Sequence, residues 1–572
     1  MKLEEIITAA RGMEPADIVL KNARYLNVFT DSFEEGCIAI KNGYIIGVPE
    51  EYEGLKEIDL EKQLVVPGFI DAHIHIESSM LTIPRLTEVI LPQGTTSIVV
   101  DPHEIANVLG TEGISYILKS SKYQKINVYM LLPSCVPSTP WETSGAELDS
   151  VDLLPFLDNP WVLGLAEMMN YPGVLMKDTE VLNKIKIAQG RVIDGHCPRL
   201  LGKDLNAYLS MHITSDHEST GVQEAREKIS KGMHLFIREG TTSRNLLDLL
   251  PVVNEATYRH CSFCSDDRDP DTLLNEGHIN SIIASAIKEG IPPVYAYKMA
   301  SYNTARYFQL RELGAVAPGY QADLAVIPDE RTPHPSMVIK NGEVVFEKNS
   351  LLVSPAIQET FVPVRGTMNV RWLTLEDFKI PARSSRARIM EIIPDQIITR
   401  QSVEKVLIKN GMIESDLHKD VLKLVVIERH YASGRIGKAL VRGFGLQRGA
   451  LASSVAHDSH NLIVLGVQEE DMLAAAVEIV KMQGGMCTVE NGKVLASCPL
   501  PIAGLMSQDP ARKVAKRLKE IIRAAHSLGC KAQHPFLALA FLSLPVIPEL
   551  KLTDKGLFDV NNFEFCDLFI DN

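Results

Sequence analysis

Long hydrophobic runs are missing from this sequence of 572 residues, although hydrophobic residues make up 45% of it. A membrane-spanning helix needs about 18 consecutive apolar residues, and no such stretch occurs. The first twenty residues, MKLEEIITAARGMEPADIVL, also lack a charged segment followed by an apolar one, so they do not predict a signal peptide. We therefore expect no membrane span and no membrane partner.

Cysteine is sparse, with nine residues scattered along the chain. An odd, scattered set fits a reducing cytosol better than a disulfide framework, so we expect a cytoplasmic protein. Cys261 and Cys264 form a CxxC pair, but no second CxxC completes a zinc site. We interpret these two residues as buried thiols beside a strand.

An excess of basic charge is also missing, because the formal net charge is −14 and the pI is near 5.7. Nucleic acids and anionic membranes favour clustered Lys and Arg, so we expect neither as a partner. The GxGxxG and Walker spacings of phosphate-binding loops do not occur. The overall composition is that of a globular protein, and the length suggests about two to four domains.

Short alternating strands are present at two places far apart in the chain. Residues 17–30 and 37–48 alternate apolar and polar side chains, with an Asn-Gly pair at 42–43. Residues 334–347 repeat the pattern with a second Asn-Gly pair. Because Asn-Gly favours two-residue hairpin turns, we predict one small β-domain assembled from both places. A central domain would then be inserted between them.

The central region alternates strand-like and helix-like segments over about 250 residues, which predicts a (β/α)8 barrel. Helical periodicity is seen, for example, at 111–123 and 221–232. The eight candidate strands are 64–72, 97–101, 128–134, 162–168, 191–196, 213–218, 234–240 and 261–267. After about residue 378 comes a polar join, and the mixed strands and amphipathic helices beyond it predict a separate α/β domain.

Two histidines, His73 and His75, stand one residue apart in PGFIDAHIHIESSM at 67–80. Strand alternation would point both rings to the same face. An HxH pair alone fits either two ligands of one metal ion or two hydrogen-bonded histidines in a hairpin. Four later candidate strands each end on a further possible ligand, namely Glu167, His196, His217 and Asp266. Because the carboxyl ends of barrel strands meet at one mouth, we predict a metal site built from all six residues.

Longer strings resemble a known family. PGFIDAHIH and the segment MASYNTARYFQLRELGAVAPGYQADLAVI at 299–327 resemble the amidohydrolase superfamily. Within that superfamily, HIHIESSMLTI and VVDPHEIANVLG closely resemble bacterial adenine deaminases. The likeness covers most of the chain, including a C-terminal domain found in that family.

The resemblance implies a (β/α)8 barrel at 65–313, a composite β-sandwich from 1–64 plus 314–378, and a C-terminal α/β domain at 379–572. It also implies hydrolytic deamination of adenine to hypoxanthine and ammonia, a step of purine salvage. By position, His73, His75 and Asp266 would hold one metal, and His196 and His217 the other. Glu167 would bridge them, where many relatives use a carboxylated lysine. Resemblance favours Mn²⁺, and the donor set also suits Fe²⁺ or Zn²⁺.

The expected chemistry is attack of an activated water on C6 of adenine. Asp266 is the expected proton shuttle to the leaving amine. The donor to ring nitrogen N1 stays open, because many purine deaminases carry His-x-x-Glu on strand five where this chain has HCPR at 196–199. Glu167, Glu77 and Asp101 are the candidates for that role.

Three further residues are candidates for substrate contact: Glu77, Asp101 and His103. Glu77 and Asp101 would either touch the purine or pair structurally within the mouth. His103 would stack on the base, support a ligand, or simply bond within its loop. Ser78 and Ser79 are expected to cap the following helix.

Some interpretations stay open at this point. His457, Asp458 and His460 fit a second metal site, a lid over the barrel mouth, or a plain turn. The alternatives to deamination are an amidohydrolase that acts on a cyclic amide or an N-acetyl group, and a non-catalytic scaffold. Scaffold relatives typically lose ligand residues, whereas all six positions are occupied here. A homodimer is the expected assembly, although the sequence does not give the oligomeric state.

Overall fold

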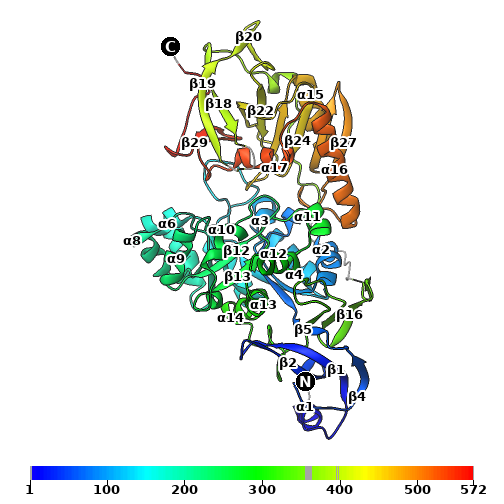
Figure 1. The fold of residues 1–572 in the computed structure, drawn as a ribbon. Coiled ribbons are helices and arrows are strands. Elements are labelled where there is room, and N and C mark those ends of the chain that lie inside the picture. Colours follow the sequence, from blue (N-terminus) through cyan, green and yellow to red (C-terminus); the bar gives the residue numbers. More distant parts are fainter. Residues whose placement is uncertain (1–2, 355–363, 394–395, 397, 571–572) are drawn as a thin grey trace.

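The computed structural model describes residues 3–354, 364–393, 396 and 398–570. Three parts follow one another along the molecule (Figure 1): the N-terminal sheet at the bottom of the view, a barrel in the middle, and the C-terminal domain at the top. Within the described ranges, no helix combines the length and the apolar character needed to cross a membrane.

The first part is a nine-stranded sheet that both ends of the expected composite domain build together. Helix α1 (Leu3–Ala10) precedes it. Its strands are β1 (Ala16–Asn27), β2 (Ser32–Lys41), β3 (Tyr44–Gly47), β4 (Gly54–Asp59), β5 (Leu64–Pro67), β14 (Leu324–Ile327), β15 (Met337–Lys340), β16 (Glu343–Glu347) and β17 (Ser350–Leu351). Antiparallel pairing of β5 with β14 joins the two segments. One buried cluster contains residues of β1 and β2 together with residues of β14 and β15, so the strands share a core of their own.

Both Asn-Gly pairs form the expected hairpin turns. Asn42 and Gly43 connect β2 to β3 with φ values of 51° and 83°. Asn341 and Gly342 connect β15 to β16 with φ values of 50° and 75°. Positive φ at both central residues is what the type I′ turn requires, and Asn-Gly meets that requirement with little strain.

The boundary at which the barrel begins was placed too early. Residues 64–67, which we expected to open the first barrel strand, are β5 of the N-terminal sheet. The barrel begins with β6 (Phe69–Ile74), and Gly68 separates it from β5. The run is broken at Pro67-Gly68, and this break lets one apolar segment serve two different sheets.

The eight strands of the barrel confirm the predicted fold. They are β6 (Phe69–Ile74), β7 (Thr95–Val100), β8 (Asn127–Leu132), β9 (Val162–Met168), β10 (Val192–Gly195), β11 (Ser215–Asp216), β12 (His234–Arg238) and β13 (Cys261–Cys264). They pair in parallel as a set of five, β6 to β10, and a set of three, β11 to β13. Parallel bridges between Ile193 and Ile213 and between Ile74 and Asp266 join the two sets, which closes the circle.

Helices fill the connections between these strands, as a barrel requires. They are α2 (Ile83–Ile90), α3 (His103–Leu109), α4 (Thr111–Ser121), α5 (Ser150–Leu157), α6 (Tyr171–Met176), α7 (Thr179–Ile187), α8 (Gly202–Leu209), α9 (Val222–Ser230), α10 (Leu246–Leu249), α11 (Pro270–Asn275), α12 (Ile279–Lys288), α13 (Pro293–Met299) and α14 (Tyr302–Tyr307). The two helices predicted from periodicity at 111–123 and 221–232 correspond to α4 and α9.

The C-terminal domain is the expected mixture of strands and helices. Its main sheet has eight strands in the order β19-β18-β23-β22-β25-β24-β26-β27. The strands are β18 (Arg386–Ile392), β19 (Thr399–Lys405), β22 (Val421–Ile427), β23 (Ile436–Arg442), β24 (Ala450–Ser453), β25 (Leu462–Gly466), β26 (Gly485–Glu490) and β27 (Lys493–Pro499). Helices α15 (Glu469–Lys481), α16 (Ala511–Ser527) and α17 (Pro535–Ala540) pack against it. Smaller sheets contain β20 (Leu407–Lys409) with β21 (Met412–Glu414), and β28 (Leu550–Thr553), β29 (Gly556–Asp559) and β30 (Glu564–Phe565).

The boundary expected at 378/379 does not match the packing. Met368, Leu373 and Phe378, assigned by sequence to the composite domain, lie in one buried cluster with Val425 and Leu462 of the C-terminal domain. These side chains are apolar and the nearest available core is that of the following domain, so the segment packs there. Residues 355–363 of the same assignment lie outside the described residues.

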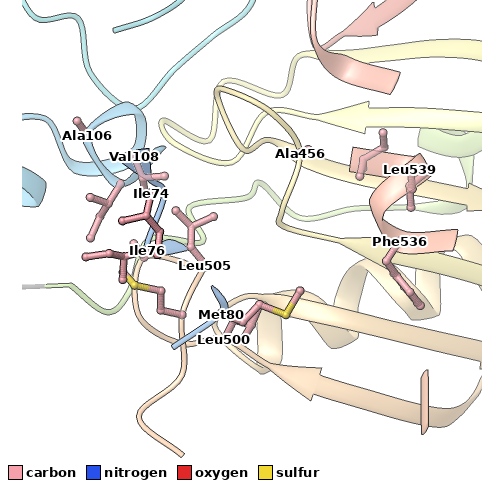
Figure 2. Packing of buried hydrophobic residues seen from close by; sticks show 14 of the residues in the cluster. Ile74, Ile76, Met80, Ala106, Val108, Ala456, Leu500, Leu505, Phe536 and Leu539 are labelled. Carbon is pink, nitrogen blue, oxygen red and sulfur yellow. The ribbon is translucent and has the colours of Figure 1, made fainter. Parts of the chain in front are cut away.

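The C-terminal domain is packed directly onto the barrel. Figure 2 shows Ile76 and Met80, which follow the first barrel strand, close to Leu500 and Leu505 of the C-terminal domain. All four belong to one buried cluster that spans both domains. Because burial of an apolar side chain contributes about 1.5–3 kcal/mol, this shared core fixes the position of the domain relative to the barrel mouth.

Candidate metal centre

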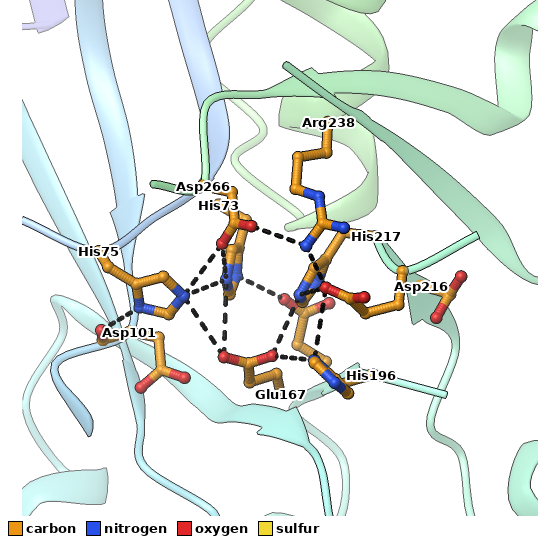
Figure 3. Close-up of polar contacts among 12 residues, drawn as sticks. His73, His75, Asp101, Glu167, His196, Asp216, His217, Arg238 and Asp266 are labelled. Atoms are coloured by element: carbon orange, nitrogen blue, oxygen red, sulfur yellow. Dashed lines mark hydrogen bonds and ion pairs between the residues drawn. The ribbon is translucent and has the colours of Figure 1, made fainter. Parts of the chain in front are cut away.

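All six residues predicted as ligands lie at the carboxyl end of the barrel strands and face one another. His73 is in β6 and Glu167 is in β9, while the other four follow the ends of their strands by one or two residues. Figure 3 shows the side chains of His73, His75, Glu167, His196, His217 and Asp266 gathered at this mouth. Each strand end supplies one or two donors, so the barrel fold alone brings together groups that are up to 193 residues apart, from 73 to 266.

The first group consists of His73, His75 and Asp266. The Nε2 atoms of the two histidines are 3.1 Å apart. Asp266 Oδ1 is 3.6 Å from Nε2 of His73 and 3.1 Å from Nε2 of His75. Ligands about 2.1 Å from one metal ion are separated from each other by about 3.0–3.4 Å, so these spacings suit a shared cation.

The second group consists of His196 and His217. His196 Nδ1 lies 2.6 Å from Glu167 Oε2, and His217 Nε2 lies 3.1 Å from the same oxygen. The other oxygen of Glu167 faces the first group, 3.4 Å from His75 Nε2 and 3.9 Å from His73 Nε2. Glu167 therefore presents one carboxylate oxygen to each group, which is the geometry of a bridging ligand.

The groups behind the two histidines indicate which ring nitrogens face inward. His75 Nδ1 lies 3.1 Å from the backbone carbonyl of Asp101 and donates its hydrogen to it. His73 Nδ1 faces Asp194 Oδ2 at 3.4 Å. Both Nε2 atoms then carry lone pairs that point at each other, an arrangement that a cation between them stabilises. The residues present therefore fit a bound metal.

The electrostatics of the mouth also favour positive charge. Burial alone would lower the pKa of His75, but the hydrogen bond with Asp266 and the charges of Asp267, Asp266 and Glu167 raise it well above its usual value. Burial opposes the charge of Glu167, but His196 and His217 bring its pKa well below the usual range. The buried carboxylates thus stabilise positive charge on the neighbouring histidines, and the same carboxylates would stabilise a divalent cation at this place.

Comparison with known proteins agrees with the fold and identifies the family. The amidohydrolase family model matches residues 64–345, and the model of the adenine deaminase C-terminal domain matches residues 396–564. The chain is 48% identical to an adenine deaminase of Desulfatibacillum aliphaticivorans over 99% of both chains. It is 46% identical to adenine deaminase 2 of Carboxydothermus hydrogenoformans and to an adenine deaminase of Dehalococcoides mccartyi, over 98% of each chain. The chain belongs to the adenine deaminase family.

Two charged residues at the mouth were not predicted for this member of the adenine deaminase family. Glu218 Oε1 lies 3.8 Å from His217 Nε2 and 4.0 Å from His196 Nδ1. Arg238 donates from Nη1 to both Glu218 Oε1 and Asp266 Oδ2. Both residues lie within candidate strand segments that the sequence had identified. Arg238 was missed because a guanidinium is never a metal ligand, and Glu218 because His217 already accounted for that strand.

The three candidates for substrate contact lie at the same mouth. Asp101 accepts a hydrogen bond from the backbone N–H of His103 at 3.0 Å and lies 3.2 Å from Nδ1 of the same residue. His103 Nδ1 is also 3.5 Å from Glu167 Oε1. Glu77 Oε1 accepts from the backbone N–H of Ile105 at 3.0 Å, whereas Oε2 has no hydrogen-bond partner among the described residues. Burial and the nearby Glu104 raise the pKa of Glu77 to about 7.

The loop with His457 and His460 lies against the barrel, as one of its three open interpretations expected. His457 Nδ1 lies 3.0 Å from Glu104 Oε1 in helix α3. His460 Nε2 is 3.8 Å from Glu104 Oε2, while its Nδ1 accepts a hydrogen bond from the backbone N–H of Ala456 at 3.2 Å. A neutral imidazole that accepts at Nδ1 carries its proton on Nε2. The cluster therefore joins the two domains through Glu104, and its three side chains also lie close enough together to hold a metal ion.

Two smaller expectations have different outcomes. Ser78 and Ser79 do not cap helix α2, whose N-cap is Thr82. Ser78 donates to Asp267 instead, and Ser79 bonds within its own turn. Cys261 and Cys264 are buried free thiols in β13, as expected, and burial raises the pKa of Cys261 to about 12.

Proposed function

We propose that the protein hydrolyses adenine to hypoxanthine and ammonia, as a step of purine salvage. The observation that carries this proposal is the convergence of all six donors at the mouth of a chain that belongs to the adenine deaminase family. In the reaction, the oxygen of water bonds to C6 and the C6–N6 bond breaks. One water proton leaves with the amine as ammonia, and N1 of the ring gains the other.

We assign two divalent metal ions to the six donors. His73, His75 and Asp266 would hold one, His196 and His217 the other, and Glu167 would bridge them. Such ions lower the pKa of a bound water from 15.7 toward about 7 and so supply the nucleophile. A donor set of imidazoles and carboxylates without thiolate suits Mn²⁺, with Fe²⁺ or Zn²⁺ as alternatives. Metal analysis of the purified protein, followed by reconstitution with each ion, tests this assignment.

Asp266 is proposed to move the proton from the attacking water to the leaving amine. Its Oδ2 is held by Arg238 Nη1 at 2.9 Å, while Oδ1 faces the histidines of the first group. The ion pair fixes the carboxylate plane and leaves one oxygen for proton transfer. Arg238 also counters the effect of burial, so the pKa of Asp266 lies well below its usual value and the group stays ionised as an acceptor.

Glu77 is proposed to serve N1 of the purine. Glu167 is occupied by imidazoles of both groups, and Asp101 is bonded to His103. Glu77 has one carboxylate oxygen without a partner among the described residues and a pKa of about 7, so it can carry the proton that N1 must gain. Asp101 and His103 are proposed as groups that position Glu167 and the ring of His75.

Ammonia release from adenine, compared with release from cyclic amides and N-acetylated compounds, tests the proposal directly. We expect turnover of adenine and none of the others. Turnover of a cyclic amide or an N-acetyl substrate without adenine would favour the alternative amidohydrolase. Absence of turnover with every substrate, in protein that carries two metal equivalents, would favour a scaffold.

We also propose a cytoplasmic homodimer. All nine cysteines carry free thiols, which supports a reducing compartment. Light scattering coupled to size-exclusion chromatography measures the assembly, and a mass of one chain would rule out the dimer.

A further inference from the structure

A pocket lies between the barrel mouth and the C-terminal domain, and both domains line it. The barrel side includes Glu77, which follows β6, and Asp267, which follows β13. These two residues stand two positions and one position after the proposed ligands His75 and Asp266. The pocket therefore borders the carboxyl end of the barrel strands, and two of its lining residues adjoin metal donors in the sequence.

The C-terminal side of the pocket has a different chemistry. It is mainly apolar and includes Phe536 and Leu537 of helix α17, with His457 from the loop between β24 and β25. A purine is a flat ring with apolar faces and polar edges. Small-molecule sites typically combine apolar walls with a few converging polar groups. Carboxylates on one side and apolar side chains on the other suit such a ring.

We propose that the C-terminal domain forms one wall of the purine-binding pocket and so completes a site that the barrel alone leaves open. This inference rests on the proposed function, because it names where that substrate binds. The purine edge faces Glu77 on the barrel side, and Phe536, Leu537 and His457 cover the ring from the C-terminal domain. The domain thereby gains a role in substrate affinity.

An unsatisfied polar atom supports this assignment. Glu77 is 3% exposed, yet its Oε2 has no hydrogen-bond partner among the described residues. A buried carboxylate oxygen without a partner has lost its hydrogen bonds to water and gained none in the protein, which destabilises the folded state. A ligand N–H bound in the pocket would give this oxygen a hydrogen-bond partner. A gap left only by the packing of the two domains would leave the oxygen unpaired.

The wall is held rigidly against the barrel. The backbone N–H of His457 donates to the carbonyl of Ala540 in α17 at 3.1 Å, and its ring stacks on Phe541 with centroids 4.6 Å apart. Its Nδ1 lies 3.0 Å from Glu104 in α3 of the barrel. His457 therefore joins the loop, helix α17 and the barrel mouth, and a prebuilt wall of this kind lowers the ordering cost of binding.

The experiment fills the pocket from the C-terminal side. Leu537 is half-buried and lines the pocket, so Leu537→Trp adds volume there without opening a cavity. The matched control is Leu495→Trp on β27 of the same domain, where Leu495 is 44% exposed and lies outside the pocket. The protein is the metal-loaded full chain. The measurements are metal content, KM and kcat for adenine, and the affinity for hypoxanthine, a product that is not consumed.

We expect Leu537→Trp to raise KM and weaken hypoxanthine binding at least about tenfold, with metal content and melting temperature unchanged. Leu495→Trp should match the wild type. Phe536→Leu, which keeps most of the apolar volume, provides a second variant if Leu537→Trp does not fold, and we expect a smaller loss of affinity in the same direction.

Two failures can be told apart. A wild-type protein that neither releases ammonia from adenine nor binds hypoxanthine would overturn the proposed function, and this inference with it. A wild type that does both, together with folded Leu537→Trp and Phe536→Leu variants of unchanged KM and affinity, would overturn only the inference. In that case the C-terminal domain would be a purely structural neighbour of the barrel.

Discussion

The guanidinium of Arg238 lies 2.9 Å from the outer carboxylate oxygen of Asp266 and also bonds Glu218. Asp266 belongs to the first proposed metal group, and Glu218 lies beside the histidines of the second. The guanidinium of Arg238, in strand β12, thus bonds a carboxylate beside each of the two proposed metal groups. Its positive charge partly balances a buried group of carboxylates, so Arg238 is a positioning residue for the whole site.

Replacing Arg238 should weaken metal binding more than it changes the fold. In Arg238→Gln, both carboxylates lose their charged partner and can turn away from the ligand positions. We expect metal affinity to fall about 10- to 100-fold. The affinity of Arg238→Lys should be intermediate, because lysine keeps the positive charge but lacks the several N–H donors of the guanidinium. Competition with a metal-binding dye measures the affinity. Unchanged affinity in Arg238→Gln would show that the ion pair does not position Asp266.

Asp266→Asn should abolish turnover while the chain stays folded. The amide keeps the shape of the side chain but can neither accept the water proton nor bind metal as a carboxylate does. We expect a loss of at least about 10³-fold in kcat, with an unchanged circular dichroism spectrum. Metal content is measured in the same preparation. Retention of most activity would rule out the proposed proton shuttle.

Removal of metal should lower the melting temperature. The ligands converge in the folded barrel only, so a bound ion stabilises the folded state by about 4 kcal/mol when its concentration is 1,000 times Kd. We expect a chelator to lower the Tm by several degrees, and added Mn²⁺ to restore it. A His73→Ala, His217→Ala double variant is the control, because it should respond to neither treatment. An identical chelator effect on that control would attribute the change to another site.

Acid should destabilise the protein partly through His234, the first residue of β12, whereas the metal donors lie at the carboxyl ends of the strands. Burial lowers the pKa of His234 to about 3, whereas the unfolded chain has its ordinary value of 6.5. Below pH 6.5 the unfolded state binds a proton that the folded state does not, so the free energy of unfolding falls as the pH falls from 6.5 toward 3. Above pH 6.5 this contribution is constant.

His234→Gln should therefore flatten the fall of Tm between pH 6.5 and pH 4. The amide is neutral at every pH and can still bond the hydroxyl of Ser262, which lies 2.8 Å from His234 Nε2. Thermal melts of wild type and variant across this range make the measurement, with His526→Gln, a change on the surface, as the control. Parallel curves for all three proteins would mean that His234 does not titrate on unfolding.

The sequence could predict much of the fold because its local patterns are strong. The Asn-Gly pairs at 42–43 and 341–342 specify hairpin turns by backbone conformation alone. The alternation of strands and helices specifies a barrel because parallel strands need helical crossovers. Once the barrel is given, ligands at strand ends must meet, and this is why the six donors were found without knowledge of any distance.

The misplaced boundaries have a common cause. Residues 64–67 are as apolar as the barrel strand that follows, and hydrophobicity does not say which sheet a strand joins. Met368 and Phe378 are likewise apolar, and only the packing shows that their core is the C-terminal one. Sheet membership and core membership depend on long-range contacts, which leave no periodic pattern in the sequence.

What the sequence determined by itself is therefore the set of elements, the barrel and the identities of the groups at its mouth. What only the tertiary structure decided is how those groups share their atoms: the two oxygens of Glu167 between two sets of histidines, the Arg238 ion pairs, and the contact between His457 and Glu104. The physical reason is that a donor type is a property of one residue, whereas hydrogen-bond geometry and burial belong to residues that meet only when distant parts of the chain fold together.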